Sequence, residues 1–568
     1  MPEEMDCRQK ILSDDYRDFL VNTRESTLFN IVNEARVCVQ KVLGEYRILS
    51  AREGREERQL ATLGFQTVPK LYTITDSTNM DVSGITKLRN QPYLNLNGSG
   101  ILVGLIDTGI DYMHPVFRYS DGSSRIIGIW DQTIQTGETP PGIMYGSEYR
   151  KELIDEALKL PDPHQLVPTD DEIGHGTFMA GIAAGGEDIQ NDFIGAAPNA
   201  SIAMVKLKEA KPYLKEFFRV RDGAYAVQEN DIMMGIKYLL DTAGRMDMPL
   251  VILITLGTNM GGHETGTYLS NLLSDISSYI GLCTVVSGGN EGAENSHYRS
   301  RVPATESIDT VELTVAKGSI GFTMEFWTTI PASVSFSIIS PTGERIRDVR
   351  VRPGKHEEYQ FVFEETEITV DYIIPFGVEG DNVIFLRFIN PTPGLWRIQV
   401  SGQFISPDEN FDIWLPVRDF MGEGTYFLRP DPYITLTDPA NTQRVITVSA
   451  YNHKDNSIYL RSGRGYTRRG DIKPDIAAPG VNIFGPAPGG GFTSQSGASV
   501  AAAHVAGGSA LMLEWGMGRN HIYSMDTGSI KGYLIRGADR MPNGIYPNRE
   551  WGYGRFNLYQ AFEQLRNS

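Results

Sequence analysis

Three short segments carry side chains that together could perform nucleophilic catalysis. Asp107 ends a run of apolar residues, His175 stands between Gly174 and Gly176, and Ser499 opens a stretch of small residues. A serine hydroxyl becomes a strong nucleophile when a histidine takes its proton and a carboxylate orients that histidine. Because the three residues are far apart in the chain, only a fold that brings them together can form such a site.

Each of these residues also has a purely structural interpretation. An aspartate after a strand is commonly a turn or helix cap, and a serine at a helix N-terminus is by default an N-cap. His175 could simply start a helix without any further task. However, Ser499 would lie where exposed N–H groups and the helix dipole favour developing negative charge. An imidazole can take and return a proton near neutral pH, so the catalytic interpretation stays open beside the structural one.

The order Asp107, His175, Ser499 is that of the triad in subtilisin, and the chain resembles the subtilisin-like serine peptidase family. The resemblance covers about residues 100–300 and 440–560. Four further segments carry it: the asparagine loop 287–292, the cleft strand 255–257, the segment 473–481 before the serine helix and the closing motif 552–557.

This resemblance implies a serine endopeptidase in which Ser499 attacks a peptide carbonyl, His175 transfers the proton and Asp107 orients the imidazole. It further implies that Asn290 donates its side-chain amide to the oxyanion; the alternative for this residue is an Asx turn between glycines. The resemblance assigns the following residues to the walls of the substrate cleft: Thr255, Leu256, Gly257, Ser287 and Gly288.

The resemblance implies neither a cofactor nor an assigned metal. Asp162 and the run Asp170-Asp171-Glu172 form a loose acidic group, and the family often binds calcium through carboxylates and carbonyls. No D-x-D-x-D-G loop occurs, so calcium stays open and no metal ligands are assigned.

Apolar runs and helical patterns alternate around these residues. The runs 101–106, 202–207, 250–256 and 282–286 are continuous, as expected of parallel strands covered on both faces. Helix-like stretches lie between them at 231–243 and 268–280. Strand and helix in alternation predict an α/β fold with a doubly wound parallel sheet, in which functional groups gather at the carboxyl ends of the strands.

Residues 302–440 break this rhythm. Short alternating strands at 311–315, 334–338 and 396–400 are separated by Pro- and Gly-containing turns, which is typical of an antiparallel jelly roll. The α/β features return near Val445, so this domain is inserted. We expect a catalytic domain over residues 78–301 and 441–568.

Residues 1–77 read as a small α/β unit, although they could also be the first part of one domain. A strand is predicted at 46–50, a helix at 53–63, β-type residues at 65–75 and a polar linker at 75–79. With the inserted jelly roll and the run 83–96, this unit gives the chain a narrower resemblance to the clostridial Csp germination proteases. That resemblance implies a prodomain that is an intramolecular chaperone, is cut off autocatalytically near 71–80 and can stay bound. It also implies a spore cortex hydrolase zymogen as the protein substrate.

Composition limits the alternatives. The chain has 568 residues, of which 41% are apolar, and its formal charge is 52 − 70 = −18, which argues against wrapping nucleic acid or binding anionic membranes. The three cysteines, Cys7, Cys38 and Cys283, argue against a disulfide framework and for a reducing compartment. The acidic start lacks the apolar region of a signal peptide, and no apolar run is long enough to span a bilayer. We therefore expect a cytoplasmic or spore-associated protein.

Some positions depart from the family pattern. Ala498 stands where the family has a threonine before the nucleophile, and Val500 where it has a methionine. Phe178 and Ala503 replace a second histidine and a proline. None of these changes removes a triad atom, but Ala498 deletes a hydroxyl near the nucleophile. The alternative function is therefore a catalytically weak scaffold that acts as a binding or regulatory protein in germination.

Overall fold

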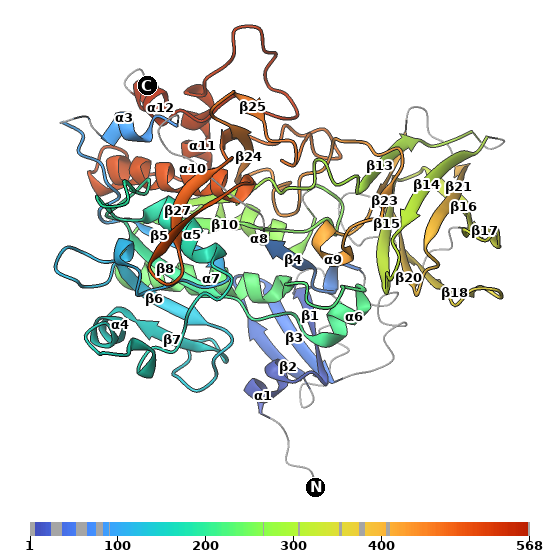
Figure 1. Ribbon diagram of the computed structural model, residues 1–568, viewed down its shortest axis with the longest axis horizontal. Helices are drawn as coiled ribbons and strands as arrows, with labels where there is room; N and C mark the ends of the chain where they lie inside the picture. Colours follow the sequence, from blue (N-terminus) through green and yellow to red (C-terminus); the bar gives the residue numbers. More distant parts are fainter. Residues whose placement is uncertain are drawn as a thin grey trace.

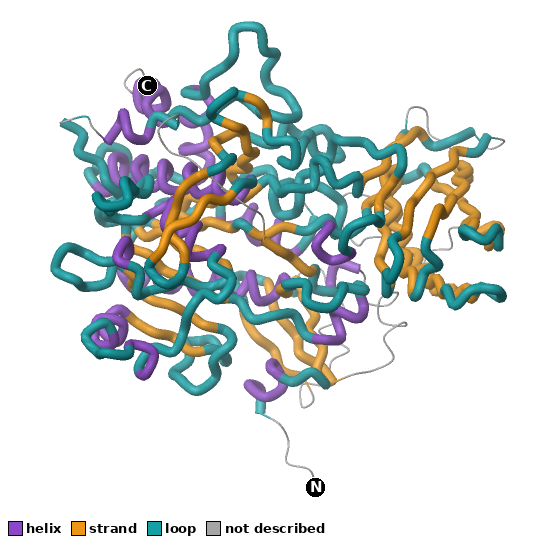
Figure 2. Tube along the Cα trace, viewed as in Figure 1, coloured by secondary structure: helices purple, strands orange, loops and turns teal. Residues whose placement is uncertain are grey.

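In the computed structural model, a central α/β body carries a small N-terminal sheet and an inserted domain of antiparallel strands (Figure 1). Helices gather in the central body, whereas the insertion is built mainly of strands and loops (Figure 2). The predicted fold class is therefore confirmed. The structure describes residues 6–23, 37–52, 65–74, 83–89, 91, 93–264, 266–304, 307–350, 355–373, 381–404 and 409–565.

The central sheet has nine strands in the order β25-β24-β12-β10-β5-β8-β6-β7, with β26 beside β24. All pairings are parallel except those of β7 and β25, which are antiparallel. The apolar runs of the sequence form its middle strands, whose residues are buried because helices cover both faces. The strands are β5 (Leu102–Asp107), β6 (Ile126–Asp131), β7 (Ser147–Arg150), β8 (Ser201–Lys206), β10 (Leu250–Ile254), β12 (Leu282–Ser287), β24 (Ile446–Asn452), β25 (Ser457–Ile458) and β26 (Ile476–Pro479).

Two helices made of small residues pass through the core, α5 (His175–Ala184) and α10 (Ala498–Leu513), and all their residues are buried. They approach closely: a Cβ at Gly507 of α10 would lie 2.5 Å from the Ala183 carbonyl of α5. The predicted helices at 231–243 and 268–280 correspond to α7 (Glu229–Met246) and α8 (Tyr268–Ile276). The other α-helices are α1 (Cys7–Leu12), α3 (Ile85–Arg89), α4 (Lys151–Ala157), α6 (Pro212–Phe217), α9 (Arg418–Met421), α11 (Thr527–Arg536) and α12 (Leu558–Leu565).

Short turns of other helix types complete the helical elements. They are η3 (Phe65–Thr67), η4 (Pro115–Phe117), η5 (Pro163–Gln165) and the π-turn η6 (Glu514–Gly518). In the part of the chain that the structure describes, we find no helix with the length and apolar character that crossing a bilayer requires.

The insertion packs a six-stranded sheet, β13-β22-β15-β20-β19-β18, against a five-stranded sheet, β17-β16-β21-β14-β23. The strands predicted from alternation lie in β14, β16 and β21. Aromatic and β-branched residues from both sheets form a separate core that includes Phe326 and Trp396. The strands are β13 (His297–Arg301), β14 (Asp309–Val315), β15 (Gly321–Thr329), β16 (Ser333–Ile339), β17 (Arg345–Arg350), β18 (His356–Gln360), β19 (Glu367–Ile373), β20 (Asp381–Ile389), β21 (Gly394–Phe404), β22 (Asn410–Trp414) and β23 (Tyr426–Phe427).

The N-terminal unit is an antiparallel sheet of β1 (Tyr16–Asn22), β3 (Tyr46–Arg52) and β2 (Val37–Lys41), in that spatial order, with α1 against it. The strand predicted at 46–50 is β3. The helix predicted at 53–63 and the linker predicted at 75–79 both lie outside the described residues.

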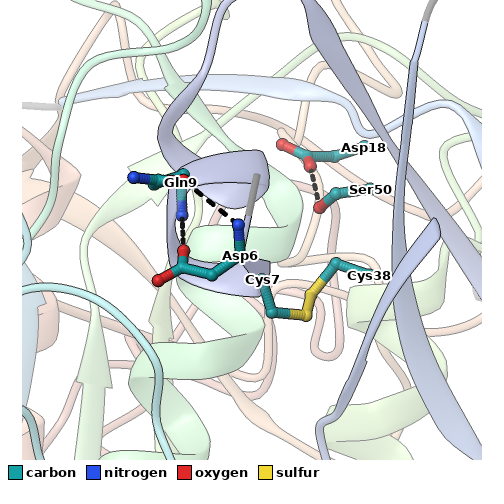
Figure 3. The surroundings of a disulfide bond; sticks show 6 residues. All are labelled: Asp6, Cys7, Gln9, Asp18, Cys38 and Ser50. Carbon is teal, nitrogen blue, oxygen red and sulfur yellow. Dashed lines mark hydrogen bonds between the residues drawn. A yellow bond between two sulfur atoms is a disulfide. The ribbon is translucent and has the colours of Figure 1, made fainter. Parts of the chain in front are cut away.

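A disulfide joins Cys7 of α1 to Cys38 of β2, as Figure 3 shows. The expectation that the cysteines form no disulfides is therefore wrong for this pair. The packing of α1 on β2 brings the two Cα atoms within 5.2 Å, a normal separation for a disulfide. Counting cysteines cannot reveal this proximity, because the residues are 31 positions apart. Cys283 is buried and free.

Two smaller sheets lie near the carboxyl ends of the central strands. The hairpin of β27 (Ile483–Ala487) and β28 (Gly491–Gln495) contacts α5. The second sheet places β4 (Leu71–Ile74), the last described strand of the N-terminal unit, between β9 (Val227–Gln228) and β11 (Leu256–Gly257). In Figure 1, β4 accordingly lies inside the central body and not with β1–β3.

Candidate active site

Asp107 and His175 meet at the carboxyl edge of the central sheet. Asp107 is the last residue of β5 and His175 is the first residue of α5. The His175 Nδ1 lies 2.7 Å from Asp107 Oδ1, and both side chains are buried. This close approach requires glycine at position 176, because a Cβ there would overlap the Gly109 carbonyl. The contact leaves the other ring nitrogen of His175, Nε2, as the atom that can exchange a proton with a nucleophile.

The surroundings of Asp107 keep its carboxylate ionised. Burial opposes ionisation most strongly, but the charge of His175 and hydrogen bonds from His175, Thr255 and Thr108 outweigh it and hold the pKa of Asp107 below its usual value. The Thr255 hydroxyl donates to Oδ2 at 2.5 Å, and the Thr108 N–H donates to Oδ1 at 2.7 Å. An anionic Asp107 can therefore fix the orientation of the imidazole and stabilise its protonated form.

Asp171 holds the start of the histidine helix in place. Its buried carboxylate accepts hydrogen bonds from Gly174 N–H, from the N–H and hydroxyl of Thr177, and from the Thr108 hydroxyl, all between 2.7 and 2.9 Å. Asp171 thus ties α5 to the residue that follows Asp107. The sequence analysis placed Asp171 in a loose acidic group, because a single sequence does not distinguish a buried cap from an exposed carboxylate.

Ser499 is the second residue of α10, and its side chain is buried. Its hydroxyl donates to the Thr255 carbonyl at 3.3 Å. Thr255 therefore contacts two members of the predicted triad, Ser499 through its carbonyl and Asp107 through its side chain. The structure thus brings Asp107, His175 and Ser499 together around the end of β10.

Asn290 lies next to the serine helix, in the loop that follows β12. Its Oδ1 accepts a hydrogen bond from the Ala498 N–H at 3.1 Å. With the oxygen held in this way, the amide NH2 group is the part of the side chain that can donate into the cleft, which Asn290 lines together with His175. The left-handed backbone of Gly289, with φ of 83°, turns the chain immediately before Asn290.

The Thr437 side chain lies against both Gly257 and Gly289. A Cβ at either glycine would overlap the Thr437 side chain. Thr437 is buried, and among the residues that the structure describes its hydroxyl finds no hydrogen-bond partner. Gly257, Asn290 and Thr437 all line the same cleft as His175. Thr437 is not recognisable from the sequence, because nothing about a lone threonine indicates that it lines a cleft.

The other residues predicted to flank the cleft lie close by with more limited contacts. Leu256 is buried and pairs through its backbone with β4. Ser287 accepts a hydrogen bond from the Gly289 N–H at 3.3 Å, which supports the asparagine loop from within. The Gly288 N–H donates to Val448 of the neighbouring strand at 2.8 Å. Ser287 and Gly288 therefore hold the loop in place.

A strand of the N-terminal unit, β4, pairs with β11, whose Gly257 lines the cleft. In antiparallel register, Thr73 of β4 lies opposite Gly257 and Ile74 opposite Leu256. On the other side, Leu71 and Tyr72 pair with β9. Ile74, the last residue of β4, thus lies opposite the residue that follows Thr255, whose carbonyl accepts a hydrogen bond from Ser499. Residues 75–82 lie outside the described residues.

The acidic residues considered for calcium do not converge. Asp162 caps η5, Asp171 caps α5, and Asp170 pairs with Lys206 at 3.3 Å. Among the residues that the structure describes, no three His, Cys, Asp or Glu side chains form a group that could hold a metal ion.

Comparisons with known proteins agree with this geometry. The profile of the subtilase family, peptidase S8, matches residues 98–319 and 433–554. The chain is 25% identical over 471 residues to the subtilisin-like protease SBT1.9 of Arabidopsis thaliana, and 23% identical over 505 residues to the minor extracellular protease Vpr of Bacillus subtilis. These alignments cover 73% and 83% of this chain, which spans only 57% and 52% of the length of those relatives.

One solved structure is matched over a larger share of its own length than these two relatives. The structure of the Clostridium perfringens CspB protease superimposes with a TM-score of 0.76 at 35% sequence identity. The superposition covers 86% of this chain and 97% of that one.

Proposed function

This chain belongs to the subtilase family, and on that premise we propose that it is a serine endopeptidase whose catalytic residues are Ser499, His175 and Asp107. The observation that carries the proposal is the chain of contacts in which Asp107 holds His175 and Thr255 joins Asp107 to the Ser499 hydroxyl. A buried, oriented imidazole beside a serine at a helix N-terminus is suited to acyl transfer.

In the proposed reaction, the Ser499 hydroxyl turns from the Thr255 carbonyl to His175 and attacks the scissile carbonyl carbon as Nε2 takes its proton. The resulting oxyanion is stabilised by the Asn290 amide and the Ser499 N–H at the start of α10. His175 then gives the proton to the leaving amine, and the peptide C–N bond breaks. Water, deprotonated by His175, attacks the acyl-enzyme ester and releases the carboxylate product and the Ser499 hydroxyl.

The N-terminal unit is proposed to be a prodomain that the enzyme cuts from itself between Leu71 and Met80. The support is the place of β4, which runs antiparallel to β11 and ends at Ile74, opposite Leu256 and one residue from the threonine that contacts Ser499. β4 lies between β9 and β11 and pairs with both. An extended substrate that adds to a sheet in this way gains main-chain hydrogen bonds. The cut is expected shortly after Ile74, the last residue of β4.

The same unit is proposed to stay bound after cleavage and to assist folding. It contacts the catalytic domain away from the cleft: Tyr46 donates to Asp275 at 2.8 Å, and Asp18 pairs with Lys211 at 3.1 Å in a buried ion pair. These contacts do not depend on the peptide bond after β4, so cutting that bond leaves them in place.

The proposed substrate in trans is a spore cortex hydrolase zymogen, activated by limited proteolysis in a spore during germination. This proposal is supported by the resemblance to the clostridial Csp germination proteases and by the 35% identity to the Clostridium perfringens CspB protease. Limited proteolysis requires that the protease cleaves its substrate at one site only. A prodomain strand that stays bound beside the cleft would help to exclude other proteins.

Intact-mass analysis of the purified chain tests the proposal. The wild type is expected to show a cut between Leu71 and Met80, and Ser499→Ala is expected to remain whole. An uncut wild type that also fails to react with a fluorophosphonate probe would instead support the alternative, a regulatory scaffold without turnover.

A further inference from the structure

Tyr72 is a fully buried residue of β4, the strand that pairs with β11 beside the cleft. Its side chain is fully buried, and its hydroxyl donates to Asp438 Oδ2 at 2.9 Å. Tyr72 belongs to the same buried hydrophobic cluster as Leu256 and Leu436 of the catalytic domain. Tyr72 thus crosses from the N-terminal unit into a pocket that the catalytic domain builds.

The polar end of this pocket is organised around Asp438. Its carboxylate accepts hydrogen bonds from the Thr267 hydroxyl at 2.9 Å and from the Ser270 hydroxyl at 2.7 Å, in addition to the bond from Tyr72. Thr267 also caps α8 by accepting from the Ser270 N–H, so both hydroxyl groups are held by a helix start. Asp438 directly follows Thr437, which lines the cleft together with His175.

The charge states favour a hydrogen bond from phenol to carboxylate. Burial, followed by the nearby charge of Asp438, raises the pKa of Tyr72 well above its ordinary value, so the phenol keeps its proton. Burial raises the pKa of Asp438 to about 6, which still leaves it ionised at neutral pH. A buried carboxylate is costly unless donors surround it, so phenylalanine in this pocket would leave Oδ2 with one donor fewer.

Main-chain pairing cannot distinguish one extended segment from another, whereas a side-chain pocket can. Only one strand can occupy the place between β9 and β11, so a substrate cut in trans has to replace β4 there. Ile74 lies opposite Leu256, and Ser499 touches Thr255, the residue before Leu256. A substrate segment bound in the register of β4 would place its next residue opposite Thr255, beside Ser499. We therefore infer that Ser499 attacks the carbonyl of that substrate residue and that Tyr72 marks the position three residues before it.

We propose that the pocket around Asp438 selects substrates that carry a tyrosine three residues before the residue whose carbonyl Ser499 attacks. The substrate class is a protein with an accessible extended segment of the form Tyr-x-x-x, cut after the fourth residue. This inference deepens the proposed function and rests on it. It makes the segment around Tyr72 a copy, within the chain, of the sequence that the enzyme recognises in its protein substrate.

The test uses the full chain and two fluorogenic peptides that reproduce residues 70–79, one with Tyr72 and one with phenylalanine in its place. The wild type is expected to cut the tyrosine peptide with a kcat/KM about ten- to a hundredfold higher, because a site that binds a hydroxyl with a buried charge rejects the analogue that lacks it. Asp438→Asn is expected to shrink this ratio several-fold.

Self-cleavage of the full chain provides the same comparison. It tests tyrosine selection even if the retained N-terminal unit excludes both peptides from the cleft. Tyr72→Phe is expected to slow self-cleavage, whereas the matched control Tyr46→Phe, which removes a phenol–carboxylate bond outside the cleft, is expected to cleave itself at the wild-type rate.

The outcomes separate this inference from the proposed function. Equal cleavage of the two peptides, or equal self-cleavage of Tyr72→Phe and wild type, would overturn tyrosine selection while leaving the peptidase intact. Absence of all cleavage together with absence of fluorophosphonate labelling would overturn the proposed function itself.

Discussion

The Thr255 hydroxyl donates a hydrogen bond of 2.5 Å to the Asp107 carboxylate. The carbonyl of the same threonine accepts the hydroxyl of Ser499, so one residue at the end of β10 contacts two of the three triad positions. Thr255 also precedes β11, which pairs with β4. It is thus a positioning residue that links the charge of Asp107, the nucleophile and the strand beside the substrate.

Replacing Thr255 with valine keeps the shape of the side chain and removes the hydrogen bond to Asp107. We expect kcat for peptide cleavage to fall about tenfold, because a hydrogen bond to a charged group contributes about 1.5–3 kcal/mol. The fall should come with little change in KM. Thr255→Ser retains the hydroxyl and should restore most of the rate; equal losses in both variants would contradict this role.

The same substitution should change stability in acid. Asp107 has a lowered pKa, so its contribution to stability is present above the ordinary aspartate pKa and is lost as pH falls through the lowered value. In Thr255→Val the pKa of Asp107 is lowered less, and acid unfolding should start at a higher pH than in the wild type. Tryptophan fluorescence across pH 2 to 6 measures this midpoint, for which an unchanged value would count against the effect.

Asn290 has separate acceptor and donor tasks that two variants can distinguish. Its Oδ1 accepts from Ala498, and its NH2 group is assigned to the oxyanion. Asn290→Leu removes both functions, whereas Asn290→Asp keeps an acceptor for Ala498 and loses the donor. Both should lower kcat by about 10²–10³. Steady-state kinetics with a peptide substrate measure this, and wild-type kcat in Asn290→Asp would exclude the donor role.

Asp171 is predicted to contribute more to the free energy of unfolding than its neighbour Asp170. Asp171→Ala leaves four donors, three of them at the start of α5, without their acceptor and should lower the free energy of unfolding by at least about 3 kcal/mol. Asp170→Ala removes only a partly exposed pair with Lys206 and should cost less than about 1 kcal/mol. Chemical denaturation of the two variants gives both values, and similar losses would show that Asp171 does not hold the helix.

Thr437 limits the pocket between Gly257 and Gly289. Thr437→Gly removes the side chain that a Cβ at either glycine would meet, so we expect faster cleavage of peptides with a large residue before the scissile bond. Thr437→Ser removes only a methyl group and should keep the wild-type preference. A peptide panel that varies this residue measures the effect, and an unaltered preference in Thr437→Gly would place the pocket elsewhere.

Most of the α/β fold is predictable from the sequence because its signals are local. The continuous apolar runs at 101–106 and 282–286 became β5 and β12 with shifts of one residue at their ends. The small-residue stretches after His175 and Ser499 became buried helices, because only small side chains allow α5 and α10 to pack so closely. The alternating strands near 311–315 likewise formed the separate core of the insertion.

The features that sequence reasoning missed depend on contacts between distant residues. Cys7 and Cys38 are joined because α1 packs on β2, which no spacing rule predicts. The burial of Asp171 and the place of Thr437 between two glycines follow from how loops meet after folding. The Tyr72 pocket was missed for the same reason, since its partner Asp438 is 366 residues away.

Mapping the site of fluorophosphonate labelling tests most directly whether Asp107, His175 and Ser499 act together. We predict that the folded wild type is labelled at Ser499, and that His175→Ala, with unchanged circular dichroism, is not labelled. A folded wild type without label, a label on another serine, or full labelling of His175→Ala would contradict the account.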